Sequence, residues 1–131
     1  RFKDVNDHYG HPCGDFILQE VGRLLKDCVR NTDIVTRYGG DEMAIILLEV
    51  SKALAMEVSD KLRREIEKRS FVWQGATVKI TVSVGVAAAL EEGIQDWNGL
   101  VNAADQALYE AKNGGRNRVV GWSPPAKSIE S

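Results

Sequence analysis

The segment from Thr77 to Val86 constrains the fold most, because apolar residues alternate along it with small or polar ones. Every second position is apolar: Val78, Ile80, Val82, Val84 and Val86. This period of two predicts a half-buried β-strand, since successive side chains of a strand point to opposite faces of a sheet. Phe71–Trp73 precedes the segment across Gln74-Gly75-Ala76, a spacing that predicts a hairpin.

A second pair of apolar runs lies earlier in the chain. Ile34–Tyr38 and Met43–Leu48 flank Gly39-Gly40-Asp41-Glu42, and this arrangement also predicts a hairpin with a tight turn. A last short strand is expected at Val119–Trp122. The following residues, 123–131, contain two adjacent prolines and no apolar period, so we expect a disordered tail.

Three other stretches have the period of an amphipathic helix. The first runs from Ile17 to Cys28 with Asp15 as its expected N-cap, and the chain approaches it through a polar segment. The second has its apolar stripe at Leu54, Val58, Leu62 and Ile66 and begins after Ser51. The third has Leu100, Ala104, Ala107, Leu108 and Ala111 on one face, and Gly114 is expected at C′. Hairpins mixed with helices predict an α+β layer with helices packed on a largely antiparallel sheet.

The length, composition and charge of the chain argue against several classes of protein. The chain has 131 residues, which suits one domain, and 44% of them are apolar. Its 17 basic residues are outnumbered by 19 acidic ones, which argues against nucleic-acid binding through a general basic field. No apolar run approaches the roughly 20 residues of a membrane-spanning helix. We therefore expect a soluble, cytoplasmic domain without membrane contact, whose two cysteines form no disulfide framework.

The turn of the earlier hairpin combines two glycines with the carboxylates of Asp41 and Glu42. Glycines let a phosphate approach backbone N–H groups closely, whereas carboxylates repel phosphate unless a hard cation lies between them. The combination therefore suits a metal-bound nucleotide. It is also typical of an ordinary hairpin turn, because glycine and aspartate are turn formers. The turn alone leaves both alternatives open.

Four motifs in a fixed order extend the pattern beyond this turn. They are Phe2-Lys3-x-Val5-Asn6-Asp7-x-Tyr9-Gly10-His11-x-x-Gly14-Asp15, Arg37-Tyr38-Gly39-Gly40-Asp41-Glu42, Ser83-Val84-Gly85-Val86 and Ala104-Asp105-x-Ala107-Leu108-Tyr109-x-Ala111-Lys112-x-x-Gly115-Arg116-Asn117. In order and spacing they resemble the GGDEF domain, the diguanylate cyclase family. The resemblance covers residues 1–122, nearly the whole chain.

The resemblance implies a fold similar to the palm of nucleotide cyclases and polymerases, with helices packed against a ferredoxin-like sheet. It also implies a reaction in which two GTP molecules condense to cyclic di-GMP and two pyrophosphates. Each subunit of an antiparallel homodimer would hold one GTP. Mg²⁺ or Mn²⁺ would neutralise the phosphates and activate the attacking hydroxyl.

Guanine recognition falls, by the same resemblance, to Asn6 and Asp15. Their amide and carboxylate suit the acceptor and the donors on the guanine edge. Asp15 as a helix cap and Asn6 as the cap of a turn are the plainer alternatives.

The resemblance assigns phosphate contacts to Lys112 and Arg116 and adds three residues nearer the N-terminus: Lys3, Gly39 and Gly40. It makes Asp41 and Glu42 the catalytic residues and metal ligands. The two basic residues have another explanation, since cations are favoured at the C-terminus of a helix.

A product-binding site is implied upstream of the glycine turn. Arg30-Asn31-Thr32-Asp33 is similar to the RxxD motif at which many family members bind their own product. An arginine fork can pair with guanine O6 and N7, and the aspartate can accept from the guanine donors. Lys61 and Arg64 are candidates for a second basic contact. The alternative for Arg30 to Asp33 is a helix end followed by a turn. The alternative for Lys61 and Arg64 is a solvated helix face.

The chain departs from the family pattern in two places. Met43 stands where the motif has phenylalanine, and a flexible apolar side chain fills similar space, so we expect no change in mechanism. The first strand of the family, which carries an acidic metal ligand, is absent from this chain. We therefore expect a fragment of a larger protein with an N-terminal sensory or regulatory domain. A catalytically inactive receptor for cyclic di-GMP is the alternative function.

Overall fold

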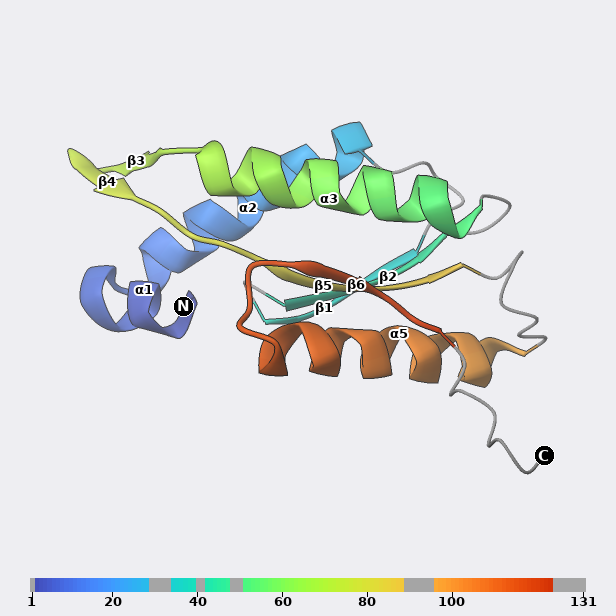
Figure 1. Ribbon diagram of the computed structural model, residues 1–131. Helices are drawn as coiled ribbons and strands as arrows, with labels where there is room; N and C mark the ends of the chain where they lie inside the picture. The colour runs from blue at the N-terminus through green and yellow to red at the C-terminus, as the bar shows by residue number, and fades with distance from the viewer. Residues whose placement is uncertain (1, 29–33, 40–41, 48–50, 89–95, 124–131) are drawn as a thin grey trace, which may run out of the picture.

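The structure is a computed structural model that describes residues 2–28, 34–39, 42–47, 51–88 and 96–123 (Figure 1). Its elements follow one another as α1 (Phe2–Tyr9), α2 (His11–Cys28), β1 (Ile34–Gly39), β2 (Glu42–Leu47), α3 (Lys52–Lys68), β3 (Phe71–Trp73), β4 (Ala76–Val78), β5 (Ser83–Ala88), α5 (Trp97–Asn113) and β6 (Val119–Gly121). The expected α+β class is confirmed. Among the described residues, no helix has the length and apolar character needed to cross a bilayer.

The main sheet has the strand order β1-β2-β5-β6. β1 and β2 form the expected antiparallel hairpin, with Gly39 opposite Glu42. The pairs β2–β5 and β5–β6 are parallel, so the expectation of a largely antiparallel sheet was wrong. Parallel neighbours need a crossover, and α3 and α5 lie in the two connections concerned.

Helices cover both faces of this sheet (Figure 1). α5 packs on one face, against β2, β5 and β6, while α3 packs on β5 and β6 from the other side and α2 packs on α3. Val84 and Val86 of β5 belong to the core on the α3 side, whereas Ala87 belongs to the core beneath α5. Because both faces are covered, every residue of β5 is buried.

The segment predicted as one strand from Thr77 to Val86 is divided. Its first part is β4, which pairs with β3 in a separate two-stranded sheet, and its last part is β5. The predicted hairpin at Gln74-Gly75 is confirmed, with φ of 48° and 82° at these two residues. Positive φ at both positions is the geometry of a tight two-residue hairpin turn.

The start of the chain differs from the prediction. The polar approach segment is the helix α1, and α2 begins at His11, so Asp15 lies inside α2 and does not cap it. Gly10 separates the two helices with a φ of 94°, and its N–H donates to the carbonyl of Asn6 at 2.9 Å. A left-handed residue that closes one helix turns the chain into the next.

The later helix predictions are largely confirmed. The Ser51 side chain accepts a hydrogen bond from the Leu54 N–H at 3.1 Å and caps α3. Leu54 itself is 46% exposed and does not belong to the buried stripe, which Ala55 and Ser59 share with Leu62 and Ile66. The predicted apolar face of α5 is entirely buried. Gly114 was expected at C′ and is instead the C-cap of α5.

Candidate active site

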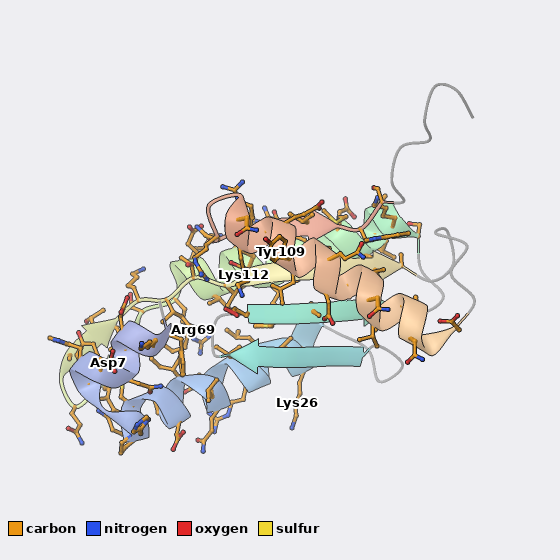
Figure 2. All side chains as sticks on the ribbon, turned by 90° about the horizontal axis from the view of Figure 1, so that it is seen from below. Asp7, Lys26, Arg69, Tyr109 and Lys112 are labelled. Carbon is orange, nitrogen blue, oxygen red and sulfur yellow. The ribbon has the colours of Figure 1, made fainter. Side chains whose placement is uncertain are left out.

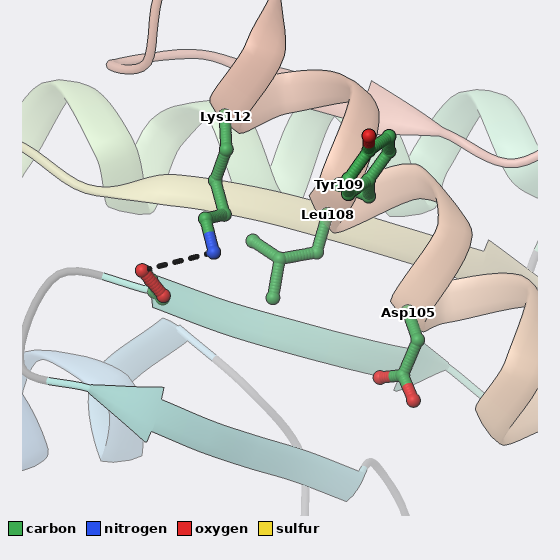
Figure 3. A pocket seen from close by; sticks show the side chains of 5 residues that line it. Asp105, Leu108, Tyr109 and Lys112 are labelled. Carbon is green, nitrogen blue, oxygen red and sulfur yellow. Dashed lines mark ion pairs between the residues drawn. The ribbon is translucent and has the colours of Figure 1, made fainter.

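A carboxylate and two cations meet where β2 begins and α5 ends. Glu42 is the first residue of β2, Lys112 lies in the last turn of α5, and Arg116 lies in the loop that follows. Lys112 Nζ lies 3.2 Å from Glu42 Oε1, and Arg116 Nη1 lies 3.9 Å from the same oxygen (Figure 3 shows the Lys112 contact). The packing of α5 on β2 and β5 brings these segments together.

The three side chains remain partly open to solvent. The exposed fraction is 20% for Glu42, 33% for Lys112 and 29% for Arg116. Ion pairs at this exposure contribute about 0–1 kcal/mol to stability, because water screens them and ordering long side chains costs entropy. A ligand phosphate can therefore compete for the two cations at little cost to the fold.

A pocket of about 290 Å³ opens beside the Glu42–Lys112 pair. Its lining is Glu42, Asp105, Leu108, Tyr109 and Lys112, so most of it comes from α5 (Figure 3). Figure 2 views the α5 side of the molecule and labels Tyr109 and Lys112 on this helix. The lining carries two carboxylates, Glu42 and Asp105, and one cation, Lys112, beside the exposed ring of Tyr109. A phosphate ligand in this pocket would therefore need a metal cation in addition to Lys112.

Glu42 fits as one ligand of a divalent cation. Mg²⁺ is usually bound by one or two carboxylates together with substrate phosphates, and the cations of Lys112 and Arg116 lie 3.2 and 3.9 Å from the Glu42 carboxylate. Within the described ranges, no group of three or more His, Cys, Asp or Glu side chains is gathered in a metal-binding arrangement. Asp41, the other predicted ligand, lies outside the described residues.

The predicted guanine-reading residues lie on the first two helices. Asn6 is half-buried on α1, and Asp15 is exposed on α2. Gly14 makes room for Asn6, because a Cβ built at Gly14 would lie 1.9 Å from Asn6 Oδ1. The Asn6 amide therefore lies against the backbone of Gly14, the residue before Asp15. Lys3 is exposed on α1.

Of the other predicted site residues near the glycine turn and the product site, the structure describes Gly39. Gly40, Arg30 and Asp33 lie outside the described residues, as Asp41 does. Gly39 ends β1, and the pairing of β1 with β2 is irregular just before it.

The basic candidates for the product site lie on α3. Lys61 is exposed, and Arg64 Nε lies 3.3 Å from Asp60 Oδ2 on the same helix. Both side chains therefore lie on the solvent-exposed face of α3.

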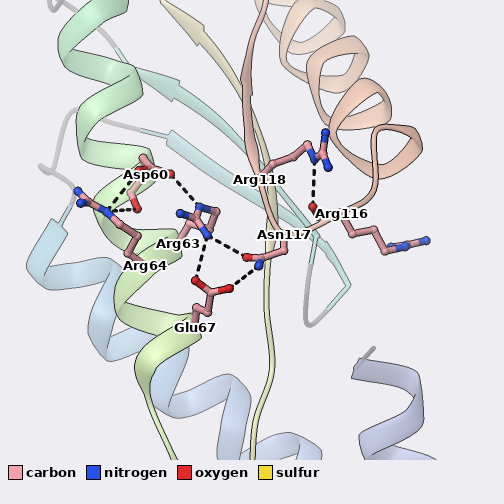
Figure 4. A network of polar contacts seen from close by, with 7 residues as sticks. All are labelled: Asp60, Arg63, Arg64, Glu67, Arg116, Asn117 and Arg118. Atoms are coloured by element: carbon pink, nitrogen blue, oxygen red, sulfur yellow. Dashed lines mark hydrogen bonds and ion pairs between the residues drawn. The ribbon is translucent and has the colours of Figure 1, made fainter.

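A polar network that was not predicted from the sequence joins α3 to the loop after α5 (Figure 4). Arg63 donates to Asp60, Glu67 and Asn117, and its pKa is raised above the usual value mainly by the hydrogen bond to Asp60. The sequence signal for this loop was Asn117 close after Gly115, because glycine and asparagine both tolerate left-handed φ and together indicate a tight loop. Gly85 was predicted only as part of a motif; the structure places it where β5 meets α5, since a Cβ there would lie 2.1 Å from the backbone nitrogen of Leu108.

Known proteins share much of the sequence and the fold of this chain. The family model described as "Diguanylate cyclase, GGDEF domain" matches residues 1–118. Diguanylate cyclase A of Treponema denticola is 41% identical over 118 residues, which are 90% of this chain and 32% of that protein. Diguanylate cyclase DosC of Escherichia coli is 41% identical over 123 residues, or 93% of this chain and 26% of that protein. The chain thus spans about a third or less of the length of these relatives.

Solved structures show the same fold. The active GGEEF domain of a diguanylate cyclase from Vibrio cholerae superposes with a TM-score of 0.79 at 30% identity, covering 95% of this chain and 78% of that chain. The GGDEF domain of DgcB from Caulobacter crescentus, solved in complex with c-di-GMP, gives a TM-score of 0.75 at 28% identity, with 92% and 71% covered. With a family model over most of its length and a matching fold, this chain belongs to the GGDEF domain family of diguanylate cyclases.

Proposed function

We propose that this chain is the catalytic domain of a diguanylate cyclase, which condenses two GTP molecules to cyclic di-GMP and two pyrophosphates. The observation that carries the proposal is the meeting of Glu42 with Lys112 and Arg116 at the edge of the pocket. The reaction requires a carboxylate that can bind a metal cation and positively charged side chains that can bind phosphates. The names of the relatives, and the c-di-GMP bound to the DgcB domain, support it.

Each condensation step forms one bond to phosphorus and breaks two bonds: one at the same phosphorus and the O–H bond of the attacking 3′-hydroxyl, whose proton passes to the solvent. The 3′-oxygen of one GTP bonds to the α-phosphorus of the other, and the bond from that phosphorus to the bridging oxygen of the β-phosphate breaks. Lys112 and Arg116 neutralise the negative charge that accumulates on the departing pyrophosphate. A bound Mg²⁺ or Mn²⁺, held by Glu42 and Asp41, would supply charge neutralisation and make the hydroxyl more acidic.

A homodimer follows from this stoichiometry. Cyclic di-GMP is symmetric, so two copies of one site, each with its own GTP, can face each other across a twofold axis. Each Asn6–Asp15 pair would read one guanine. We place the reaction in the cytoplasm, where GTP is available, and assign regulation to further domains, since the relatives are much longer than this chain.

Product inhibition is the second part of the proposal. Arg30 and Asp33 would bind guanine edges of cyclic di-GMP, with Lys61 or Arg64 of α3 contributing a further cation. Replacing Arg30 with alanine should weaken binding of cyclic di-GMP by about 5- to 150-fold, the range for loss of a bidentate arginine–guanine contact. Calorimetric titration of cyclic di-GMP into the protein and into Arg30→Ala measures this directly. Equal affinities would show that the product binds elsewhere.

Nucleotide preference tests the catalytic assignment. Asp15→Ala should reduce the preference for GTP over ATP by about 10- to 100-fold, because guanine donors are left without an acceptor. Asp7→Ala is the matched control: Asp7 is also exposed, lies on α1 and carries the same charge (Figure 2). The measurement is the rate of cyclic dinucleotide formation with each nucleotide. Cyclic di-GMP binding by a protein that does not turn over GTP would identify a receptor instead of an enzyme.

A further inference from the structure

The loop that carries Arg116 has an unusual backbone. Three consecutive residues have left-handed φ: Gly115 at 120°, Arg116 at 63° and Asn117 at 46°. This conformation costs a residue with a Cβ about 1–2 kcal/mol, and glycine avoids that cost. Two non-glycine residues in succession therefore stay in it only if other contacts hold the loop.

Those contacts come from α3, on the far side of the sheet from α5 (Figure 4). Arg63 Nη1 donates to Asn117 Oδ1 at 3.1 Å, and Asn117 Nδ2 donates to Glu67 Oε2. Arg63 is fixed in turn by Asp60 at 2.8 Å and by Glu67 Oε1 at 3.3 Å, and its side chain is only 16% exposed. Both ends of the Asn117 amide thus contact one ion pair, in which Arg63 is largely buried and the Glu67 side chain is 44% exposed.

The backbone on either side of Asn117 is fixed as well. The Arg116 N–H donates to the Ala111 carbonyl at 3.0 Å, and the Arg116 carbonyl accepts from Arg118 Nε at 3.1 Å. The carbonyl of Arg118 accepts from the Val84 N–H at 2.9 Å, which joins the end of the loop to β5. With its backbone held at both polar groups, Arg116 extends its side chain toward Glu42.

We infer that Arg63, Glu67 and Asn117 form a clamp that positions Arg116 for the nucleotide phosphates. The inference rests on the proposed function for the phosphate role of Arg116, and it adds residues on α3 that act through the loop. The clamp residues are positioning residues: their described contacts are with one another, with Asp60 and with the loop.

Two substitutions remove the clamp without forcing the backbone. Asn117→Gly keeps the left-handed conformation and deletes the amide, and Glu67→Gln removes the charge that Arg63 and Asn117 share. Glu65→Gln is the matched control, because Glu65 is an exposed carboxylate on the same helix. Each variant is titrated with GTP and with guanosine by calorimetry. We expect GTP affinity to fall about tenfold in both clamp variants, the equivalent of one hydrogen bond to a charged group.

Guanosine affinity should stay unchanged, since guanosine has no phosphate for Arg116 to meet. Equal losses for GTP and guanosine would overturn the inference, because they would indicate general loosening of the fold. Unchanged GTP affinity in Asn117→Gly would overturn it too. The control should match the unmodified protein with both ligands.

Hydrogen exchange of the Arg116 amide, followed by NMR, gives a readout that needs no nucleotide. Loss of the clamp should raise its exchange rate about tenfold, and an unchanged rate would refute the clamp. This separates the two proposals. A protein that forms no cyclic di-GMP would contradict the proposed function while the exchange rates still decide the clamp. A protein that forms cyclic di-GMP, with clamp variants indistinguishable from it, would contradict the clamp alone.

Discussion

Replacing Gly85 with alanine should disturb both stability and activity, because β5 and α5 touch through their backbones at this residue. A Cβ there would lie 2.1 Å from the Leu108 nitrogen and 2.4 Å from the Ala104 carbonyl oxygen. Ordinary contact begins at 3.4 Å, so the helix must move by about 1.3 Å to accommodate the methyl group. Neither neighbour is a flexible side chain that could turn aside.

The expected cost is at the upper end of the range for overpacking, about 3 kcal/mol. In urea this corresponds to a fall of roughly 1–3 M in the unfolding midpoint. Lys112 lies one helical turn beyond Leu108, so the displacement of α5 reaches the Glu42–Lys112 pair. Because misplacing a positioning group by about 1 Å can cost about 100-fold in rate, cyclic di-GMP formation should fall by that order.

Gly75→Ala is the matched control for this substitution. Gly75 has a φ of 82° but no neighbour within 4 Å, so alanine there adds about 1 kcal/mol of backbone strain and no clash. We expect a smaller midpoint shift and unchanged turnover. An unchanged midpoint in Gly85→Ala would refute the close contact. A large midpoint shift without loss of activity would show that the displacement does not reach Lys112.

Three further predictions concern single side chains. Glu42→Gln should abolish cyclic di-GMP formation yet change the free energy of unfolding by at most about 1 kcal/mol, since its pairs with Lys112 and Arg116 are partly exposed; an active variant would remove Glu42 from the catalytic machinery. Ser59 is 1% exposed, and its Oγ has no hydrogen-bond partner among the described residues. Burying an unpaired hydroxyl costs about 1 kcal/mol of stability, so Ser59→Ala should raise the urea midpoint. A lower midpoint would contradict this. Burial raises the pKa of Cys13, so the folded state holds the thiol proton more tightly and stability should fall as the pH rises above the pKa of the unfolded thiol. Urea titrations between about pH 7 and 10 should show a steeper decline than in Cys13→Ala, and parallel curves would contradict it.

Elements with a local cause could be predicted from the sequence. The β3–β4 hairpin follows from Gln74-Gly75, and the buried face of α5 follows from apolar residues at helical spacing. In both cases neighbours in the chain determine the conformation. The resemblance carried by the motifs identified the family. It also predicted Glu42, Lys112 and Arg116 as site residues, and the structure places the two cations 3.2 and 3.9 Å from Glu42, while their roles stay a prediction.

Contacts between distant segments were decided by the tertiary structure. Pairing β5 between β2 and β6 made two strand pairs parallel and buried both faces of β5, which an alternating pattern does not predict. Asp15 lies inside α2 and not at its start, because the break between α1 and α2 is at Gly10 and α2 begins at His11. Asn117 meets Arg63 across 54 positions of sequence. A periodic pattern records only which side of an element is apolar; which other element covers that side depends on packing over the whole chain, and that packing alone brought α3 to the loop of Arg116.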